Sequence, residues 1–411
     1  MLWLYRIGLW LYGCGIHLAA PFSNKAKLWV EGRKKIWHTL EKLPKDKKIH
    51  WFHAASLGEF EQGRPVIEEL RKRLPNDFIL LTFFSPSGYE QRKDYKGADL
   101  ICYLPLDSKQ NAQRFLELSH PTSVVFIKYE FWWYYFHEIA NRKIPFALIS
   151  AHFIVSQPFF HPIWGAFWRK LLILPNRLYV QDQSSFSLLS AYGINCIVNG
   201  DTRADRVLQL RTEQFEHSLF EQFSNHHKVV VAGSTWPADD RLLIEWVSSA
   251  AGKDWKLILV PHDLKPTYLQ SLQQGCGESM YRYSEQKQLH DNHRILLLDT
   301  IGMLSKVYRY GTIAYVGGGF GKGIHNLLEA VVYGIPVAFG PNYQRFAEAH
   351  KLLAMGVANV ISDASTFGKF VDSFEEQPER YAAVSQQLTA WFAISGGSSQ
   401  RIAEWLEEKS A

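Results

Sequence analysis

Two short stretches of the chain combine residue types that can do chemistry with a spacing typical of ligand sites. The first is His53-Ala-Ala-Ser-Leu-Gly-Glu-Phe60, which lies between the apolar run KIHWF and a segment with helical spacing. Gly58 permits a tight turn there, and Glu59 enters the loop that leads into the helix. Glu59 is therefore either a ligand-facing carboxylate or a helix-start acid that the helix dipole favours.

The same turn lies one residue away from G-x-S-x-G, the nucleophile elbow of hydrolases, with Ser56 as the nucleophile. Ala54 stands where the first glycine of that pattern belongs. Ser56 would also follow the first strand of its domain, whereas hydrolase elbows follow several strands. The pattern therefore does not favour a hydrolase.

The second stretch, residues 315–349, reads YVGGGFGKGIHNLLEAVVYGIPVAFGPNYQRFAEA. Five of the seven residues from 317 to 323 are glycine, which lets backbone N–H groups approach a ligand closely. The amino end of a helix beside such a run suits an anion such as phosphate, although the run could also be only a flexible loop. Neither a G-x-G-x-x-G in register nor a P-loop is present. Glu329, one turn into the helix, could accept two sugar hydroxyls.

The elements that must position these stretches are short β-branched runs that alternate with amphipathic segments. This alternation predicts parallel sheets with helices on both faces. The strands are expected at 49–54, 78–83, 101–104, 123–128, 146–151, 177–182 and 196–200, and then at 228–233, 256–261, 294–299, 312–318, 335–340 and 357–361. Two similar α/β domains are thus predicted, with ligands beyond the carboxyl ends of the strands in a cleft between them.

Composition agrees with two domains and excludes several kinds of site. The chain has 411 residues, of which 47% are hydrophobic, enough for more than one core. Its four cysteines are scattered without a C-x-x-C pair, so neither a disulfide framework nor a structural zinc site is indicated. No D-x-D and no His/Asp cluster with metal-ligand spacing is present, so no metal is expected.

The first 20 residues are apolar except for Arg6 and His17. Residues 1–48 hold ten Lys and Arg against three acidic residues, so the basic excess of a chain with net charge +5 lies beside this stretch. Such a segment can just cross a bilayer, and a basic flank would keep the rest of the chain on the cytoplasmic side. We expect a membrane anchor, spanning or interfacial, over a cleaved signal peptide or a buried core helix.

An ordered series of short motifs extends along nearly the whole chain. Its members are Ser56-Leu-Gly58-Glu59, Tyr129-Glu130-Phe-Trp132, Gly200-Asp201-Thr202-Arg203, Gly233-Ser234-Thr235, Asp299-Thr-Ile-Gly302-Met-Leu304, and the glycine run with Asn326-Leu-Leu-Glu329. In this order the series resembles the Kdo transferases, a family of GT-B glycosyltransferases that move 3-deoxy-D-manno-octulosonic acid (Kdo) from CMP-Kdo to the lipid A precursor.

The resemblance implies a fold and a division of the chain. The fold is GT-B, with two Rossmann-like α/β domains facing a cleft and an N-terminal hydrophobic anchor helix. Residues 1–20 would be the anchor at the cytoplasmic face of the inner membrane, and 21–205 the acceptor-binding domain. Residues 206–227 would be a linker, and 228–411 the domain that binds CMP-Kdo.

The resemblance also implies an activity: metal-independent, inverting transfer of Kdo to lipid IVA in lipopolysaccharide synthesis. Glu59 would be the general base, with Glu130 and Arg203 as further catalytic residues. The residues expected to bind the nucleotide donor are Ser234, Pro261, His262, Ile301, Gly302, Met303, Gly318, Gly319, Asn326, Leu327, Leu328 and Glu329. CMP-Kdo is a substrate, so no cofactor is implied; the partners are lipid IVA and the inner-membrane surface, without nucleic acid.

Three departures from the family pattern and three alternatives accompany this hypothesis. Arg203 stands where the family has Lys, His262 where many members have Arg, and Asp239-Asp240 replaces the usual acidic pair. Glu130 could instead be a buried partner of Lys128 or Arg203. Another GT-B transferase or epimerase that uses a UDP-sugar would share the glycine run and Glu329. A non-catalytic lipid-binding membrane protein would explain the apolar start of the chain and its aromatic residues, but would give no role to Glu59, Arg203 or residues 326–329.

Overall fold

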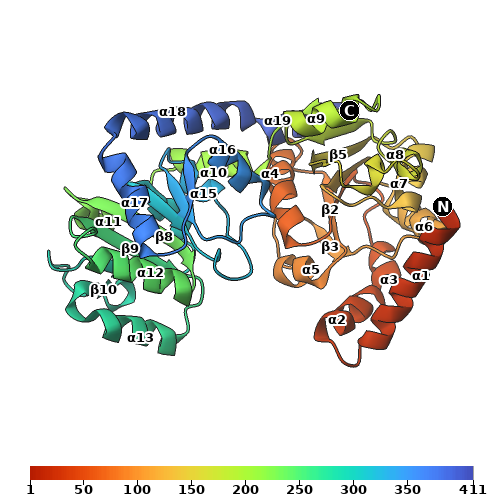
Figure 1. The fold of residues 1–411 in the computed structure, drawn as a ribbon. Helices are drawn as coiled ribbons and strands as arrows, with labels where there is room; N and C mark the ends of the chain where they lie inside the picture. Colours follow the sequence, from red (N-terminus) through yellow and green to blue (C-terminus); the bar gives the residue numbers. More distant parts are fainter. Residues whose placement is uncertain (411) are drawn as a thin grey trace. The chain divides into compact units, whose positions relative to one another are not determined.

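The computed structural model describes residues 1–410, so residue 411, the last of the predicted second domain, lies outside the described part. The chain forms two compact units, one made of residues 1–205 with those from 395 onward, and the other of residues 206–394. Each unit contains a seven-stranded sheet whose strands pair in parallel. Figure 1 shows strands and helices in both units. The prediction of two parallel α/β domains is therefore confirmed.

In the first unit the strand order is β3-β2-β1-β4-β5-β6-β7. The strands are β1 (Ile49–Ala54), β2 (Phe78–Phe83), β3 (Leu100–Tyr103), β4 (Ser123–Ile127), β5 (Phe146–Ala151), β6 (Arg177–Val180) and β7 (Ile197–Val198). Sequential order reverses between β1 and β4, which pair directly with His53 opposite Phe126. A ligand crevice in such a sheet lies beyond the carboxyl ends of the strands at this reversal.

The central strands of this sheet are apolar on both sides because both faces are covered. Trp51, Leu80 and Phe126 belong to one buried cluster, and Phe52, Leu81 and Val125 belong to another on the opposite face. The helices of the unit are α1 (Leu2–Ala19), α2 (Asn24–Arg33), α3 (Ile36–Leu40), α4 (Leu57–Arg73), α5 (Pro86–Arg92), α6 (Lys109–Ser119), α7 (Trp133–Asn141), α8 (Gly165–Arg169), α9 (Gln183–Ser190) and α19 (Ser398–Ser410). Strand burial on both faces explains the continuous apolar runs.

The last helix, α19, packs in the first unit, although the sequence places it after the second series of strands. Ile402 and Leu406 are fully buried in the cluster that also contains Val66 of α4. Arg73 of α4 forms ion pairs of 3.0 Å with both Glu404 and Glu407. The chain thus returns to its amino-terminal unit at its end.

In the second unit the strand order is β10-β11-β9-β8-β12-β13-β14, with the reversal between β8 and β12. The strands are β8 (Lys228–Thr235), β9 (Trp255–Pro261), β10 (Met280–Arg282), β11 (Ile295–Leu297), β12 (Ile313–Val316), β13 (Val337–Phe339) and β14 (Ala358–Val360). The helices are α11 (Ser218–Ser224), α12 (Pro237–Ser248), α13 (Pro266–Cys276), α14 (Leu304–Val307), α15 (Leu328–Val331), α16 (Ala347–Ala354), α17 (Ala364–Glu375) and α18 (Pro378–Ser395).

The segment predicted as a linker, residues 206–227, carries helical structure. Helix α10 (Arg203–Thr212) runs into it from the first unit, and α11 follows. Phe220 and Phe223 of α11 are fully buried, so this part of the segment belongs to the core of the second unit.

The prediction that residues 1–20 anchor the chain at the inner membrane is wrong. Within the described residues, no helix combines the length and the apolar content that crossing a bilayer demands. Helix α1 has 18 residues, and Arg6, His17 and three glycines lower its apolar content. The side chain of Tyr5 instead donates a hydrogen bond to Asp107 at 2.6 Å.

Candidate functional site

The carboxyl end of β1 carries the turn that the sequence singled out. Ser56 is the N-cap of α4 in an extended conformation, and Glu59 lies in the first turn of that helix. The Ser56 hydroxyl donates a hydrogen bond to the Oε2 atom of Glu59. Glu59 is partly exposed, so its carboxylate is held by a neighbour and is accessible from outside.

Glu130, beyond the end of β4, is joined to β1 by a hydrogen-bonded cluster. Its Oε2 atom accepts the indole N–H of Trp132 at 2.8 Å and lies 3.1 Å from Nε2 of His53. His53 is fully buried, and its Nδ1 atom lies 2.8 Å from the Thr82 hydroxyl. The sequence suggested Lys128 or Arg203 as a buried partner of Glu130. The structure shows buried His53 as a partner of this carboxylate.

Tyr129, the residue before Glu130, lies within electrostatic range of Glu59. Burial raises the pKa of Tyr129, and the carboxylates of Asp182 and Glu59 raise it further. Asp182 in turn lies 2.8 Å from Nδ1 of His152. Acidic and imidazole groups from the ends of β1, β4, β5 and β6 therefore gather at one edge of the first sheet.

Arg203 lies at the start of α10 and binds the aspartate two residues before it. Its Nη2 atom is 2.6 Å from Asp201 Oδ2, and its Nε atom is 3.1 Å from both carboxylate oxygens. Burial alone would raise the pKa of Asp201, but the Arg203 guanidinium and the Lys128 ammonium lower it below its ordinary value. The carboxylate is therefore ionised at neutral pH and holds Arg203 in place.

Three residues other than glycine adopt the left-handed backbone conformation at the carboxyl ends of strands. They are Lys128 (φ 65°), Ser150 (φ 54°) and Ser234 (φ 53°). Such a conformation costs about 1–3 kcal/mol per residue and is concentrated at functional sites. These three residues mark the same sheet edges as the carboxylates of the first unit and the glycine run of the second.

In the second unit, Asp239 ties the turn after β8 to the glycine run after β12. Its Oδ2 atom accepts the backbone N–H groups of Trp236 at 2.9 Å and Gly318 at 3.0 Å. Its Oδ1 atom accepts the Tyr315 hydroxyl at 2.6 Å. Asp239 is fully buried, so the acidic pair noted in the sequence contributes a structural link between two loops.

A stack of three rings lies over this link. The ring centroids of Trp236 and His262 are 4.9 Å apart, and those of His262 and His325 are 4.5 Å apart, with interplanar angles of 27° and 28°. A cavity of about 530 Å³ adjoins the stack and is lined by Trp236, Pro237, Ala238, Gly318, Phe320, Gly321, Lys322, Gly323 and His325. Gly318, a predicted donor-binding residue, is among the residues that line this cavity.

The predicted residues Asn326 to Glu329 form a compact turn. The side-chain amide of Asn326 makes two hydrogen bonds. Its Nδ2 atom donates to Glu329 Oε1 at 3.0 Å, and its Oδ1 atom accepts the backbone N–H of Leu328 at 3.1 Å. Leu327 and Leu328 are buried, so they anchor the turn in the core. Helix α15 has only four residues, so it supplies little of the dipole that the sequence suggested for anion binding.

In the predicted loop Ile301-Gly302-Met303, Ile301 (91% exposed) and Gly302 are exposed and Met303 is partly buried. Asp299, just before it, is fixed by Arg282 at 2.6 Å and by the Ser284 backbone at 3.0 Å. Burial would raise the pKa of Asp299, but the hydrogen bonds from Ser284 and Arg282 lower it. Hydrogen bonds to Asp299 thus hold the chain in place just before this loop.

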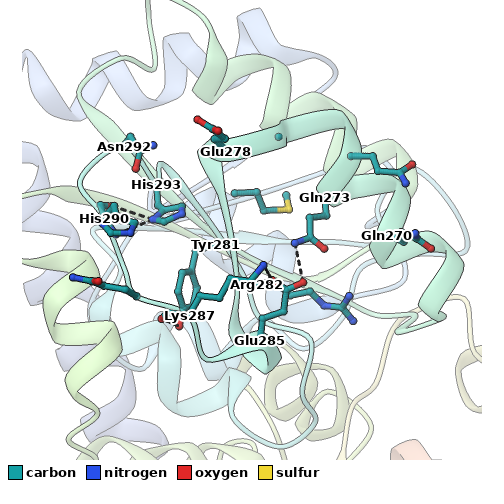
Figure 2. A pocket seen from close by; sticks show the side chains of 14 residues that line it. Gln270, Gln273, Glu278, Tyr281, Arg282, Glu285, Lys287, His290, Asn292 and His293 are labelled. Carbon is teal, nitrogen blue, oxygen red and sulfur yellow. Dashed lines mark hydrogen bonds and ion pairs between the residues drawn. The ribbon is translucent and has the colours of Figure 1, made fainter.

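Arg282 also lines a pocket of about 740 Å³ at the edge strand β10, most of whose lining residues are polar, as shown in Figure 2. In that view, Gln273 of α13 donates a hydrogen bond to Glu285 at 2.9 Å. None of the predicted donor-binding residues lines this pocket. Over residues 1–410, no three His, Cys, Asp or Glu side chains are grouped so as to hold a metal ion.

Several residues of these clusters were not among the predicted site residues. His53 and Trp132 surround Glu130, and Trp236 and His325 belong to the ring stack. His53 and Glu130 are 77 residues apart, so no local spacing could have paired them. His325 did stand next to a predicted motif, which was the one signal available for it.

Comparison with known proteins finds similarity over most of the chain. The family model of 3-deoxy-D-manno-octulosonic-acid transferase (Kdo transferase) matches residues 31–206. The 3-deoxy-D-manno-octulosonic acid transferase of Bordetella pertussis is 28% identical over 375 residues, which are 87% of this chain and 86% of that protein. The enzyme of the same name from Aquifex aeolicus is 28% identical over 306 residues, 73% of this chain and 78% of its own.

Among solved structures, the UDP-GlcNAc 2-epimerase from Neisseria meningitidis, bound to UDP-GlcNAc, matches with a TM-score of 0.58. The match covers 88% of this chain and 100% of that one at 18% identity, which shows a shared fold alone. The relatives, in contrast, extend over the sequences of both units. The resemblance seen in the motifs is therefore confirmed, and the chain is an enzyme, a glycosyltransferase related to the Kdo transferases.

Proposed function

We propose that the protein transfers Kdo from CMP-Kdo to the lipid A precursor lipid IVA in lipopolysaccharide synthesis. The observation that carries this proposal is the similarity to enzymes named 3-deoxy-D-manno-octulosonic acid transferases over 87% of the chain. That similarity includes the sequence of both units, so it is more than a shared domain.

Glu59 is the proposed general base. In an inverting transfer, the acceptor hydroxyl oxygen forms a bond to the anomeric carbon while the bond from that carbon to the phosphate oxygen breaks. The hydroxyl proton passes to the Glu59 carboxylate, and CMP leaves with the electron pair of the broken bond. A half-buried carboxylate that Ser56 orients by a hydrogen bond suits this role.

Glu130 and Arg203 are the proposed supports of the transition state. The reacting sugar becomes oxocarbenium-like, so a fixed carboxylate such as Glu130 would stabilise its positive charge. Negative charge grows on the leaving phosphate, and Arg203 keeps its positive charge at any physiological pH. The bond to Asp201 limits the positions that the Arg203 guanidinium can take.

The proposed donor contacts all belong to the second unit. They are Ser234, Pro261, His262, Ile301, Gly302, Met303, Gly318, Gly319 and residues 326–329. Support for this assignment comes from their places, since Ser234 and Pro261 lie at the carboxyl ends of β8 and β9 and the others follow β9, β11 and β12. The Glu329 carboxylate, already held by Asn326, would accept hydroxyls of the ribose.

The test is transfer from CMP-Kdo to a tetra-acylated lipid A precursor in detergent micelles. We expect product from the parent protein and a rate loss of at least ~100-fold in Glu59→Gln, the usual scale for a lost general base. Glu61→Gln is the matched control, because Glu61 lies on the same helix and pairs with Arg92 at 2.8 Å.

The outcomes separate the parts of the proposal. A parent that binds CMP but makes no product would refute the donor or acceptor assignment. A Glu59→Gln variant that matches the parent would remove Glu59 as the base while leaving the reaction in place. Stronger competition by UDP than by CMP would point instead to a UDP-sugar enzyme.

A further inference from the structure

The ring stack contains a hydrogen bond whose direction is fixed by chemistry. The indole Nε1 of Trp236 lies 3.2 Å from Nε2 of His325. An indole N–H can only donate, so Nε2 of His325 must supply a lone pair. His325 is therefore the neutral imidazole with its proton on Nδ1, which leaves Nδ1–H as its donor.

The surroundings of His325 favour this neutral form. Burial lowers the pKa of His325, and the adjacent His262 ring lowers it further, against a smaller opposite effect from Asp239. Asp239 on α12 is already engaged by three donors. Two further charged groups stand near the stack: Lys322 on the glycine run, and Asp263, which forms a 2.6 Å ion pair with Lys265.

The cavity beside the stack suits an anion. No acidic residue is among the described residues that line it, whereas the ammonium of Lys322, the imidazole of His325 and the indole of Trp236 do. The backbone N–H groups of the three lining glycines already donate inside the protein, that of Gly318 to Asp239 and those of Gly321 and Gly323 to the Gly318 carbonyl oxygen. The donors left for a ligand are therefore those of side chains. The cavity therefore offers donors and one positive charge without a competing carboxylate.

We propose that Trp236 is a positioning residue that keeps His325 neutral, so that the imidazole Nδ1–H binds an anionic group of the sugar-nucleotide donor in this cavity. The inference rests on the proposed function, because CMP-Kdo brings two anions, the phosphate and the carboxylate of the sugar. The sugar carboxylate is the group that distinguishes CMP-Kdo from CMP. A neutral donor with a fixed tautomer recognises it equally well across neutral pH.

The first arm of the test needs no substrate. In ligand-free protein with ¹⁵N-labelled histidine, His325 should be neutral at pH 7 with its proton on Nδ1. In Trp236→Phe, the tautomers should mix and the pKa of His325 should rise. Trp255→Phe is the matched control, because the indole of Trp255 donates instead to Glu375 at 3.0 Å. A charged His325 in the parent, or an unchanged ring in Trp236→Phe, overturns the positioning role.

The second arm measures KM for CMP-Kdo and the inhibition constant of CMP in Trp236→Phe and His325→Gln. We expect KM to rise about tenfold, the scale of one lost hydrogen bond, with CMP inhibition within twofold of the parent. An equal loss for both ligands would assign the same hydrogen bond to the phosphate. Unchanged values for both ligands would overturn the anion contact.

The two arms also separate this inference from the proposed function. A parent that transfers no Kdo defeats the proposed function, yet the histidine spectra still report on the bond between Trp236 and His325. A parent that transfers Kdo while Trp236→Phe keeps its kinetics and its pH profile defeats the inference alone. In Trp236→Phe, kcat/KM should recover below the pH at which His325 takes up a proton, because an imidazolium always carries Nδ1–H. The parent, whose neutral tautomer is fixed, should lack this limb.

Discussion

The backbone N–H of Gly318 donates to the Oδ2 atom of Asp239 at 3.0 Å, which binds the glycine run to the first turn of α12. The same carboxylate accepts the Tyr315 hydroxyl from β12 and the Trp236 N–H from the N-cap of α12. One buried side chain thus joins the loops that follow two paired strands, β8 and β12, and both loops carry proposed donor contacts.

Asp239→Asn should destabilise the second unit by about 2–4 kcal/mol, because an amide leaves at least one of the three buried donors without an acceptor. Urea unfolding of the variant and the parent measures this difference. Asp263→Asn removes a carboxylate from an exposed ion pair and should leave the midpoint at the parental value. Equal midpoints for Asp239→Asn and the parent would contradict the linking role.

Gly319→Ala should weaken CMP binding at least tenfold, because its Cβ would lie 2.6 Å from backbone atoms of Gly340. A contact that close forces the glycine run to move away from β13. Gly321→Ala is the matched control two residues later, since its Cβ would meet nothing closer than 3.7 Å. Calorimetric titration with CMP should therefore rank Gly321→Ala near the parent, and the reverse ranking would refute the steric argument.

The sequence predicted strands well because the sheets are covered on both faces. Buried parallel strands such as β1 and β8 are continuous apolar runs, and their limits can be read within one or two residues. Strand β10 was missed, since it has only three residues and ends in Arg282. Its pairing with β11 is a tertiary contact that no local pattern records.

Two predictions about the ends of the chain show what periodicity leaves open. The sequence of an amphipathic helix such as α19 shows that one face is apolar, but not which element that face packs against. In the structure, that element is α4 of the first unit. The first 20 residues looked apolar enough to cross a bilayer by count, yet Arg6, His17 and the glycines of α1 lower the average too far. Whether a helix can span a bilayer depends on the mean hydropathy of all its residues, not on the number of large apolar residues.

The site was predictable where it follows strand ends and unpredictable where it depends on side-chain partners. Ser56 and Glu59 are three residues apart, and their hydrogen bond follows from that spacing in the first turn of a helix. The partner of Glu130 on β1, His53, depends on which strands are neighbours. The hydrogen bond between Trp236 and His325 spans 89 residues and likewise requires the folded sheet.

Asp240 predicts a dependence of stability on pH. Burial raises the pKa of this fully buried carboxyl from its ordinary 3.8 to about 6 in the folded protein. The folded state therefore holds more protons than the unfolded state between those values, so the free energy of unfolding falls as pH rises from about 4 to about 6. Asp240→Asn mimics the protonated carboxyl and should not show this fall.

The measurement is the difference in unfolding free energy between the Asp240→Asn variant and the parent at pH 4 and at pH 7. At pH 7, the variant's unfolding free energy relative to that of the parent should be higher than at pH 4 by up to about 3 kcal/mol, the equivalent of two pKa units. Other groups that titrate in this range, such as Asp107, cancel in the difference. Glu245→Gln, an exposed acid on α12, should show no such shift, and a flat difference for Asp240→Asn would disprove the raised pKa.

Glu130 can be a structural partner of His53, a support of the transition state, or both, and two variants separate these roles. Glu130→Gln keeps an acceptor for the indole of Trp132, so its unfolding free energy should stay within about 1 kcal/mol of the parent while kcat falls at least ~10-fold. Glu130→Ala leaves buried His53 without this partner and should also lose about 1–3 kcal/mol. Glu138→Gln, which alters an ion pair with Arg142 on α7, should change neither quantity appreciably. A Glu130→Gln variant with parental kcat would assign Glu130 to the support of His53 alone.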